Sequence, residues 1–421
     1  MLVCSANWLL PDGSLSCSPT ASDVAAFVRA LGTLAGRAGF RRDGRYRPVD
    51  RVDLVLAGDM LDTLSSTRWL GPLRPWQATA AATRLQTEIA AESLRRGRRT
   101  IASLRRLARQ GVFVPDATPL ARPAGDRRRV VPVRIVSLAG DHDGCLPQAE
   151  QGDPALASWP PATCTRWGDD GTVLISHGHR FDPATACSAS AEPRPPTVHE
   201  SLAIDLVVAF VWQVRETQSF TGTRVLARAL AQADPLEIPA AIASWLRHRH
   251  TGMGSLIEVR SLWQRAIRGW QRQARRDPPA VRDQGIDLTD RLAGWLDAYV
   301  PGNPPPPAPA DLMAALTPDA VSIRDVVREA GVATAVFGHF ASHGVANAAG
   351  SDEASILGLR ERRPCLPGHN LPWAAVFEQG EHVGSRHATS AAGADERAPG
   401  FSPAVIGGVS PSDVVDALRA A

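Results

Sequence analysis

Four apolar segments of the sequence end in carboxylate or imidazole side chains, which are common ligands of divalent metal ions. When the strands of an α/β sheet end at the same edge, residues far apart in the sequence meet there. A mixed set of carboxylates and imidazoles suits Mn, Fe or Zn, and such an ion can polarise a phosphoryl oxygen. The residues that carry this prediction are Asp59 and Asp62, then Asp141, His142 and Asp143, then His177 and His179, and finally His339.

Each of these endings, taken alone, also has an ordinary structural explanation. Gly-Asp after a strand, as at Gly58 and Asp59, is commonly a turn. A single histidine such as His177 or His339 is commonly a hydrogen-bonded core residue. The metal interpretation therefore depends on the four endings occurring together.

Strands and helices alternate along the parts of the chain that carry these residues. The segments 20–34 and 76–110 have apolar residues at helical spacing, and Thr20 with Asp23 forms a capping box. We expect the Pro- and Arg-rich segment 115–129 to be a loop. Strands and helices that alternate with short polar connections predict an α/β layered fold. The predicted strands are 2–5, 52–59, 130–141, 172–179 and 333–339.

The pattern changes between residues 199 and 300, where helical periodicity dominates and tryptophans are frequent. The segment PGNPPPPAPA at 301–310 is typical of a stiff polyproline-like spacer. We interpret 195–310 as a helical insertion, a cap or lid, within the α/β unit. The predicted division is 1–194 and 311–383 for the two parts of the core, 195–310 for the insertion, and 384–421 for a loop-rich tail with a short C-terminal helix.

The composition excludes several functional classes. Basic and acidic residues nearly cancel, at 46 and 43, so no nucleic-acid partner is expected. The 46 basic positions are all arginine, which excludes a lysine nucleophile or Schiff base. The six cysteines contain no CxxC pair, which favours reduced thiols over a disulfide framework or a cysteine zinc site. The N-terminus lacks the basic region of a signal peptide and no apolar stretch is long enough to span a bilayer, so we expect a cytoplasmic protein without a transmembrane segment.

The four strand endings belong to blocks that occur in a fixed order: AGDMLD (57–62), AGDHD (139–143), SHGHRFD (176–182) and FGHFASH (337–343). This order resembles the calcineurin-like metallophosphoesterase superfamily, most of all its bacterial branch near the UDP-2,3-diacylglucosamine hydrolases. The resemblance covers about 1–190 and 320–380, and the helical insertion has no counterpart. It implies a four-layer α/β/β/α sandwich with a two-metal site, at which hydroxide held between the metals attacks phosphorus.

The resemblance also implies metal ligands and catalytic residues. In it, Asp59 bridges both metals, and Asp141 stands where the family has a metal-binding asparagine. His142 is the imidazole that stabilises charge on the phosphate or the leaving oxygen, and Asp143 orients it. The implied ligands of the second metal are Asp59, Asp141, His177 and His339.

The sequence departs from the family's pattern at the other metal position. The family's first block is Asp-x-His, where this chain has Ala6 and Trp8, and the second histidine of the last block is Ala341. In the family, these three positions bind the first metal and not the second. All four ligand positions of the second metal hold residues that can coordinate an ion. Two carboxylates around one divalent ion leave it neutral overall, so we expect a mononuclear site.

Three side chains are candidates to refill the missing positions: Asp12, His179 and His343. The bulk of Trp8 opposes such a rescue, because the indole would occupy the volume that an ion needs. The ordinary interpretation of Trp8 is that it fills the vacated site with apolar surface.

The sequence favours a metal-dependent phosphoesterase that hydrolyses phosphomonoesters or phosphodiesters. The alternative is a catalytically inactive metallophosphoesterase-like binding or scaffold protein, and a third reading is a structural remnant that holds no metal. His142 and Asp143 favour catalysis because neither is needed merely to bind a metal, whereas Trp8 and Ala341 favour the inactive protein. The oligomeric state stays open.

The expected substrate is a phosphorylated small molecule or a lipid-linked one. The insertion combines tryptophan and leucine with arginine, which would suit an amphipathic phosphorylated compound such as a lipid-linked sugar. The ordinary explanation is a helical pack with tryptophan and leucine inside and arginine on the solvated face. The arginines concerned are Arg215, Arg224, Arg228, Arg247 and Arg249.

Overall fold

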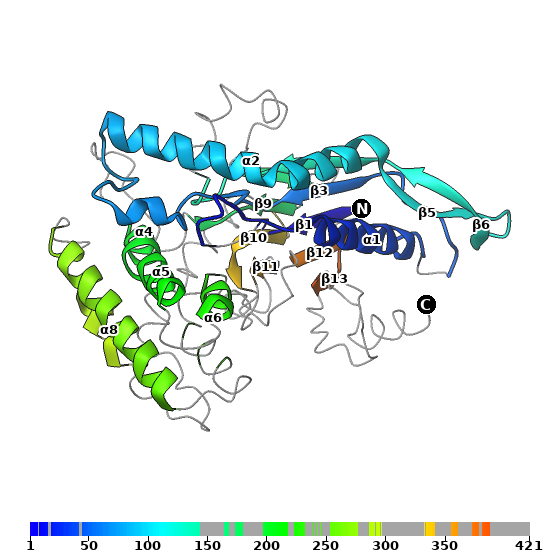
Figure 1. Ribbon diagram of the computed structural model, residues 1–421. Coiled ribbons are helices and arrows are strands. Elements are labelled where there is room, and N and C mark those ends of the chain that lie inside the picture. Colours follow the sequence, from blue (N-terminus) through cyan, green and yellow to red (C-terminus); the bar gives the residue numbers. More distant parts are fainter. Residues whose placement is uncertain are drawn as a thin grey trace.

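The protein is described by a computed structural model, whose ribbon is shown in Figure 1. The N-terminal third is described almost continuously, and the rest in shorter stretches. All statements below concern these residues. The described residues are 1–6, 8–15, 18–41, 44–143, 164–167, 173–179, 197–217, 223–231, 238, 242, 245, 253–276, 286–290, 292–294, 296, 332, 334–341, 355–360, 373–378 and 381–387.

Among the described residues, the N-terminal strands belong to a five-stranded sheet with the order β13-β12-β1-β3-β7. The strands β1, β3 and β7 are neighbours in this sheet and run parallel, so their carboxyl ends lie at the same end of the sheet. β12 pairs antiparallel with β1, and β13 antiparallel with β12. The strands are β1 (Leu2–Ser5), β3 (Val52–Leu56), β7 (Val133–Ser137), β12 (Trp373–Glu378) and β13 (Glu381–His387).

A second sheet contains four described strands in the order β11-β10-β9-β8. β9, β10 and β11 are parallel, and β8 is antiparallel to β9. The other described strands form two two-stranded sheets. In one β2 pairs with β4 in parallel, and in the other β5 and β6 form an antiparallel hairpin. These strands are β8 (Cys164–Trp167), β9 (Val173–Ser176), β10 (Thr334–Ala341), β11 (Ser355–Arg360), β2 (Leu10–Pro11), β4 (Leu61–Asp62), β5 (Val112–Ala117) and β6 (Pro123–Val131).

Two predictions about segments 115–129 and 130–141 are wrong. The first is not a loop, because much of it forms the β5–β6 hairpin, in which both faces of β6 are largely exposed. A strand exposed on both faces, with arginines at 127–129, has no apolar alternation by which it can be recognised. The second is not a single strand, since β6 ends at Val131 and β7 begins at Val133. Pro132 lies between them and has no N–H to give to a ladder.

Two long helices cover the five-stranded sheet. α1 (Ala21–Arg37) begins at the predicted capping box, in which the Thr20 side chain accepts from the Asp23 N–H and the Asp23 carboxylate accepts from the Thr20 N–H. α2 (Ala80–Gln110) is preceded by Thr79, whose hydroxyl accepts from the backbone N–H of Ala82. Both helices are amphipathic, so each presents an apolar face to the sheet.

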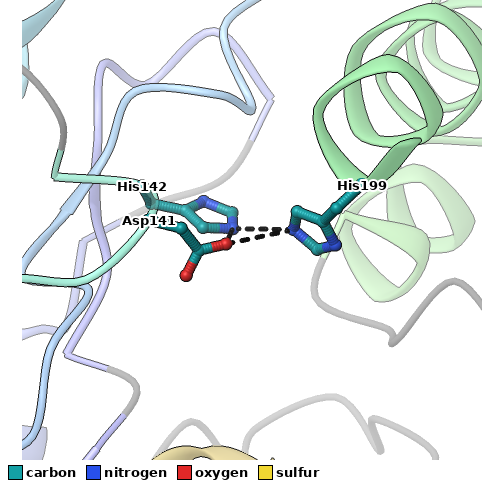
Figure 2. Close-up of side chains that lie close together, drawn as sticks. All are labelled: Asp141, His142 and His199. Atoms are coloured by element: carbon teal, nitrogen blue, oxygen red, sulfur yellow. Dashed lines mark hydrogen bonds and ion pairs between the residues drawn. The ribbon is translucent and has the colours of Figure 1, made fainter. Parts of the chain in front are cut away.

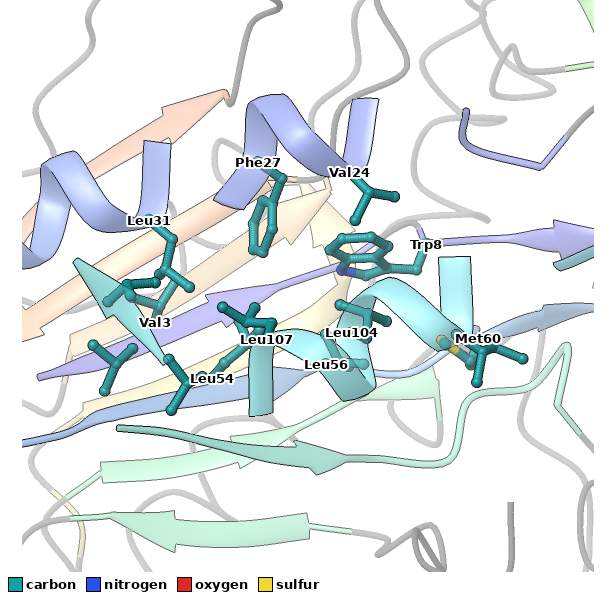
Figure 3. Packing of buried hydrophobic residues seen from close by; sticks show 14 of the residues in the cluster. Val3, Trp8, Val24, Phe27, Leu31, Leu54, Leu56, Met60, Leu104 and Leu107 are labelled. Carbon is teal, nitrogen blue, oxygen red and sulfur yellow. The ribbon is translucent and has the colours of Figure 1, made fainter. Parts of the chain in front are cut away.

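A helix-facing core fills the space between these helices and the sheet. Val3, Leu54 and Leu56 point into it from the strands (Figure 3). Trp8 lies in the same core, where its ring meets that of Phe27 edge to face at a centroid distance of 4.9 Å. Its indole N–H donates to the Ser5 hydroxyl at 3.0 Å, which satisfies the one polar atom of the buried ring. Packing against α1 therefore accounts for Trp8.

A second core lies between the two sheets. Residues that alternate with the helix-facing ones, such as Cys4 and Val55, point into it from β1 and β3. Val173 and Ile175 of β9 and Val336 of β10 face them from the second sheet. The described chain therefore has a helix layer, a sheet and a facing sheet. The predicted mixed α/β class is confirmed.

The described residues between 198 and 296 form helices with a hydrophobic core of their own, here called the helical part. Trp263 and Trp270 are fully buried in that core and Trp245 nearly so, as the helical-pack interpretation predicts, while Trp212 is 40% exposed. None of the helices in the described part of the chain has the length and apolar character that a bilayer crossing requires. The helices are α4 (Val198–Ser201), the π-helix η3 (Leu202–Val208), α5 (Ala209–Glu216), α6 (Thr223–Leu230) and α8 (Met253–Ala274).

A buried ion pair joins the helical part to the α/β core. The Arg74 guanidinium donates through Nε and Nη2 to one carboxylate oxygen of Asp205, at 3.0 and 2.7 Å. Arg74 follows the 3₁₀ helix η1 (Thr67–Leu70), and it also donates to the backbone carbonyls of Trp69, Gly71 and Leu73. Burial raises the pKa of Asp205, and the guanidinium acts in the opposite direction. The helical part is thus fixed next to the strand ends.

Candidate metal centre

Three of the four predicted metal ligands meet in one place, because each follows the carboxyl end of a strand. Asp59 follows β3, Asp141 follows the neighbouring parallel strand β7, and His177 follows β9 of the facing sheet. The Nε2 atom of His177 lies 2.8 Å from Oδ1 of Asp141 and 3.2 Å from Oδ2 of Asp59. We call this cluster the strand-end position.

Glycines at the strand ends allow this close approach. A Cβ atom on Gly140 would lie 2.0 Å from Oδ1 of Asp59, and one on Gly338 would lie 1.9 Å from the carbonyl oxygen of Ala57. Gly58 has a φ of +95°, which side-chain-bearing residues rarely adopt, and a Cβ there would meet the His177 ring at 2.1 Å. Glycine before the ligands in these blocks is therefore a steric requirement of the site.

Hydrogen bonding fixes which nitrogen of His177 faces the carboxylates. Its Nδ1 atom lies 2.7 Å from the carbonyl oxygen of Ala57, which can only accept, so Nδ1 carries a hydrogen. Nε2 then faces two carboxylate oxygens, an arrangement that needs a proton or a cation between the three atoms. Burial lowers the pKa of His177, but Asp59 and Asp141 outweigh it and raise this pKa well above the ordinary value. The two carboxylates and this nitrogen are donor types that divalent cations take, and Asp141 with His177 belongs to a group whose atoms lie close enough to hold one.

Asp59 is held in an unusual conformation that directs it at the centre. Its φ is +53°, in the left-handed region, and its Oδ1 atom accepts from the backbone N–H of His142 at 3.2 Å. Burial by itself raises the pKa of Asp59, yet the nearby imidazoles of His177 and His142 hold it below the ordinary range. The carboxylate is charged at neutral pH, as a metal ligand must be.

His142 lies beside these residues and is oriented by Asp62, not by Asp143 as predicted. The Nδ1 atom of His142 lies 2.9 Å from Oδ1 of Asp62, whose side chain is buried. Burial lowers the pKa of His142, but Asp59, Asp62 and Asp141 raise it to about 10. In the metal-free protein this imidazole is therefore protonated at neutral pH.

Asp143 instead connects two strand-end loops. Its Oδ1 atom accepts from the backbone N–H of Leu61 at 2.6 Å, and Oδ2 accepts from the N–H of Gly140 at 2.9 Å. Burial and the charge on Asp59 raise the pKa of Asp143. Its carboxylate faces backbone, so its part in the site is to hold the loops that carry Asp59 and His142.

The structure adds a residue that the sequence analysis did not single out, His199 of α4. Its Nε2 atom lies 3.4 Å from Nε2 of His142 and 3.5 Å from Oδ2 of Asp141 (Figure 2). α4 begins with a capping box between Thr197 and Glu200, which fixes the helix start that carries His199. That capping box is the sequence signal at this place, but it identifies a helix and not a ligand.

Of the candidate replacements for the missing ligands, His179 lies at the strand-end position, whereas Asp12 has a structural role elsewhere. His179 lies next to His177, with ring centroids 5.4 Å apart, and together with Asp141 the two histidines form a group that could hold a metal ion. Asp12 accepts from the Ser14 N–H and from the Ser66 hydroxyl, so it caps a loop.

The remaining residues named from the sequence are the histidines of the last block and Ala6. His339 lies on β10, but its side chain is outside the described part of the chain, as is all of His343. Ala6, which the sequence resemblance aligns with a metal-binding aspartate, is buried in the apolar core between the sheets.

Comparisons with protein-family models, with curated proteins and with solved structures found no match for this chain. The fold and the site are therefore interpreted from their own geometry. The described residues define a mixed α/β protein with Asp and His groups that can hold a metal ion at the ends of its strands.

Proposed function

We propose that this chain is a metal-dependent phosphoesterase that hydrolyses phosphomonoesters or phosphodiesters. The single observation that carries the proposal is the strand-end position, where Nε2 of His177 lies within 3.2 Å of a carboxylate oxygen of both Asp59 and Asp141, each after a different strand. The sequence blocks that supply these residues are those that resemble the calcineurin-like metallophosphoesterases. The proposed cofactor is one Mn, Fe or Zn ion per chain, held at the strand-end position with His339 as a further ligand.

The residues around this position are suited to phosphoryl chemistry. When bound, a divalent cation would polarise a phosphoryl oxygen and make an attacking water more acidic. Asp59 and Asp141 provide the negative charge that holds it, and the Nδ1–H of His177 keeps that ring oriented through the Ala57 carbonyl. Asp62 fixes Nδ1 of His142, so that a proton on Nε2 of His142 points toward Asp141. That N–H can stabilise charge on a phosphate or leaving oxygen.

The proposal extends to the complete fold and to the substrate. The described helix layer and two facing sheets are consistent with a four-layer α/β/β/α sandwich in which a second helix layer covers the outer sheet. The proposed substrate is a phosphorylated small molecule or a lipid-linked one. Of the insertion's arginines, Arg224 is exposed and Arg215 binds Glu216 and the Ser14 carbonyl.

The second candidate is a catalytically inactive binding or scaffold protein. It is favoured by the surroundings of Ala6, which is buried among Cys4, Ala57 and other apolar side chains between the sheets. No carboxylate is available at this position of the chain, so a cation here would lack the charge that the family's aspartate supplies.

Hydrolysis of p-nitrophenyl phosphate and bis-p-nitrophenyl phosphate with added Mn²⁺ distinguishes the two candidates. We expect Asp59→Asn to abolish Mn²⁺-dependent activity and His142→Ala to reduce it by about 100-fold or more. Asp126→Asn is the matched control, because Asp126 is exposed on β6 and should leave the rate unchanged. Absence of any activity above that of Asp59→Asn would support the inactive binding protein.

A further inference from the structure

We propose that Asp141, His142 and His199 form a second cation position, a zinc site that joins the helical part to the α/β core. Figure 2 shows the three side chains directed at one another, with His199 entering from α4 and the other two from the loop after β7. We call this cluster the helix-side position. It is distinct from the position left by Ala6, Trp8 and Ala341, because none of its ligands comes from those blocks.

The three donor atoms have the spacing of a zinc coordination shell. Nε2 of His142 and Nε2 of His199 are 3.4 Å apart, and Oδ2 of Asp141 lies 3.5 Å from His199 and 4.0 Å from His142. The point equidistant from the three atoms lies in their plane, about 2.1 Å from each, which is the length of Zn–N and Zn–O bonds, and a slight closing of the donors would move the ion out of this plane to make room for a fourth ligand. Two imidazoles and one carboxylate leave a fourth position for water, a ligand set known from zinc enzymes.

The surroundings of His142 direct the correct nitrogen at this point. Its Nδ1 atom is 2.9 Å from the buried Asp62 carboxylate, which can only accept, so Nδ1 donates. Nε2 is then the atom left to ligate a metal. A carboxylate that holds the far nitrogen of a histidine is the usual outer partner of a zinc ligand, and it raises the basicity of the ring.

The ligands are also sheltered enough to hold an ion. The side chains of Asp141, His142 and His199 are between 11% and 14% exposed, so they lie just beneath the surface with access for a cation. His199 is supplied by a helix start that its capping box fixes, and α4 leads directly into η3, where Asp205 binds Arg74. The helix-borne ligand is therefore positioned before an ion arrives.

Asp141 connects the two positions through its two oxygens. Oδ1 faces His177 of the strand-end position, whereas Oδ2 faces His142 and His199. One carboxylate can thus bridge two cations. On the proposed function, zinc at the helix-side position takes the Nε2 atom that His142 needs for its proton, so excess zinc inhibits hydrolysis.

Equilibrium dialysis of the metal-free full-length chain against ZnCl₂, followed by metal analysis, tests this position without reference to hydrolysis. We expect wild type to bind one more zinc equivalent than His199→Ala, while His177→Ala keeps the helix-side zinc. Arg224→Ala, an exposed change on α6, is the control and should bind as wild type does. His199→Gln, checked by circular dichroism, repeats the test in a side chain that better preserves the helix surface.

The two proposals fail separately in this design. Loss of one zinc equivalent in both folded His199 variants supports the helix-side position, even if no preparation hydrolyses a phosphate ester. Zinc binding by the His199 variants that equals wild type in number and affinity would overturn it, whatever the hydrolysis assays show.

Discussion

The strand-end and helix-side positions share Asp141 but are built in different ways. At the strand-end position, donors lie 2.8 and 3.2 Å apart and come from loops that follow strands of the two facing sheets. At the helix-side position the donors are 3.4 to 4.0 Å apart, and one of them comes from a helix outside those sheets. Without an ion, the donors of the first cluster are close enough to hydrogen-bond through His177, whereas the donors of the second cluster are more widely spaced.

The backbone positions the residues of the strand-end position, whereas contacts between side chains position His199 of the helix-side position. Strand pairing and close-packed glycines bring Asp59, Asp141 and His177 together. His199 depends on how the helical part docks, which the Arg74–Asp205 pair helps to determine. Changes to the docking contacts should therefore affect cation binding at the helix-side position, and changes to the strand-end glycines should affect cation binding at the strand-end position.

The largest expected effect comes from removing the docking ion pair. Arg74→Ala leaves the buried Asp205 carboxylate without its guanidinium and should lower the free energy of unfolding by about 3–5 kcal/mol. Zinc binding at the helix-side position should weaken more than cation binding at the strand-end position. Urea denaturation measures the stability, and dialysis measures the zinc.

The matched control is Arg95→Ala, whose solvent-exposed pair with Glu92 on α2 should contribute little to the free energy of unfolding because water screens it. Equal losses in the two variants would show that the Arg74–Asp205 pair has no special part in docking.

A smaller effect is expected from filling the strand-end contact. In Gly140→Ala the new methyl group would meet Oδ1 of Asp59 at 2.0 Å, so the loops must separate, at a cost of about 1–3 kcal/mol. Cation affinity at the strand-end position should fall with it, as isothermal titration with Mn²⁺ would show. Gly125→Ala on β6, where a Cβ meets nothing within 4 Å, should leave that affinity unchanged. Similar Mn²⁺ affinities in the two variants would contradict the steric role of Gly140.

The smallest change is expected from Asp62→Asn, which alters protonation more than packing. The Asp62 carboxylate contributes to the raised pKa of His142, about 10, so the neutral amide should lower that pKa. If protonated His142 assists hydrolysis, activity falls as pH rises through this pKa, and the alkaline limb of the pH–rate profile moves to lower pH in the variant. NMR titration of the metal-free protein follows the ring directly. An unchanged His142 titration would show that Asp62 does not control it.

The sequence was sufficient to predict the strand-end position because its signal is local. Each ligand follows an apolar run, and parallel strands place such residues at one edge. Thr20 and Asp23 predicted the start of α1 for the same reason, since a capping box lies within four residues. The mixed α/β class followed from the same runs.

What the sequence could not show depends on direction in space. Asp62 and Asp143 are equally plausible partners for His142, and only the fold turns Asp143 toward the backbone of Leu61 and Gly140. His199 stands in the first turn of a helix, far along the chain from Asp141 and His142, and no periodicity indicates that α4 faces the strand ends. The β5–β6 hairpin escaped prediction because an exposed strand needs no apolar alternation.

The most direct test of the central claim is an anomalous difference map from crystals of the full chain grown with zinc and collected at the zinc absorption edge. We expect a peak about 2.0–2.2 Å from Oδ1 of Asp141 and Nε2 of His177, on the side that faces Oδ2 of Asp59. A map with no anomalous density among these three atoms, while zinc is bound elsewhere on the chain, would contradict it.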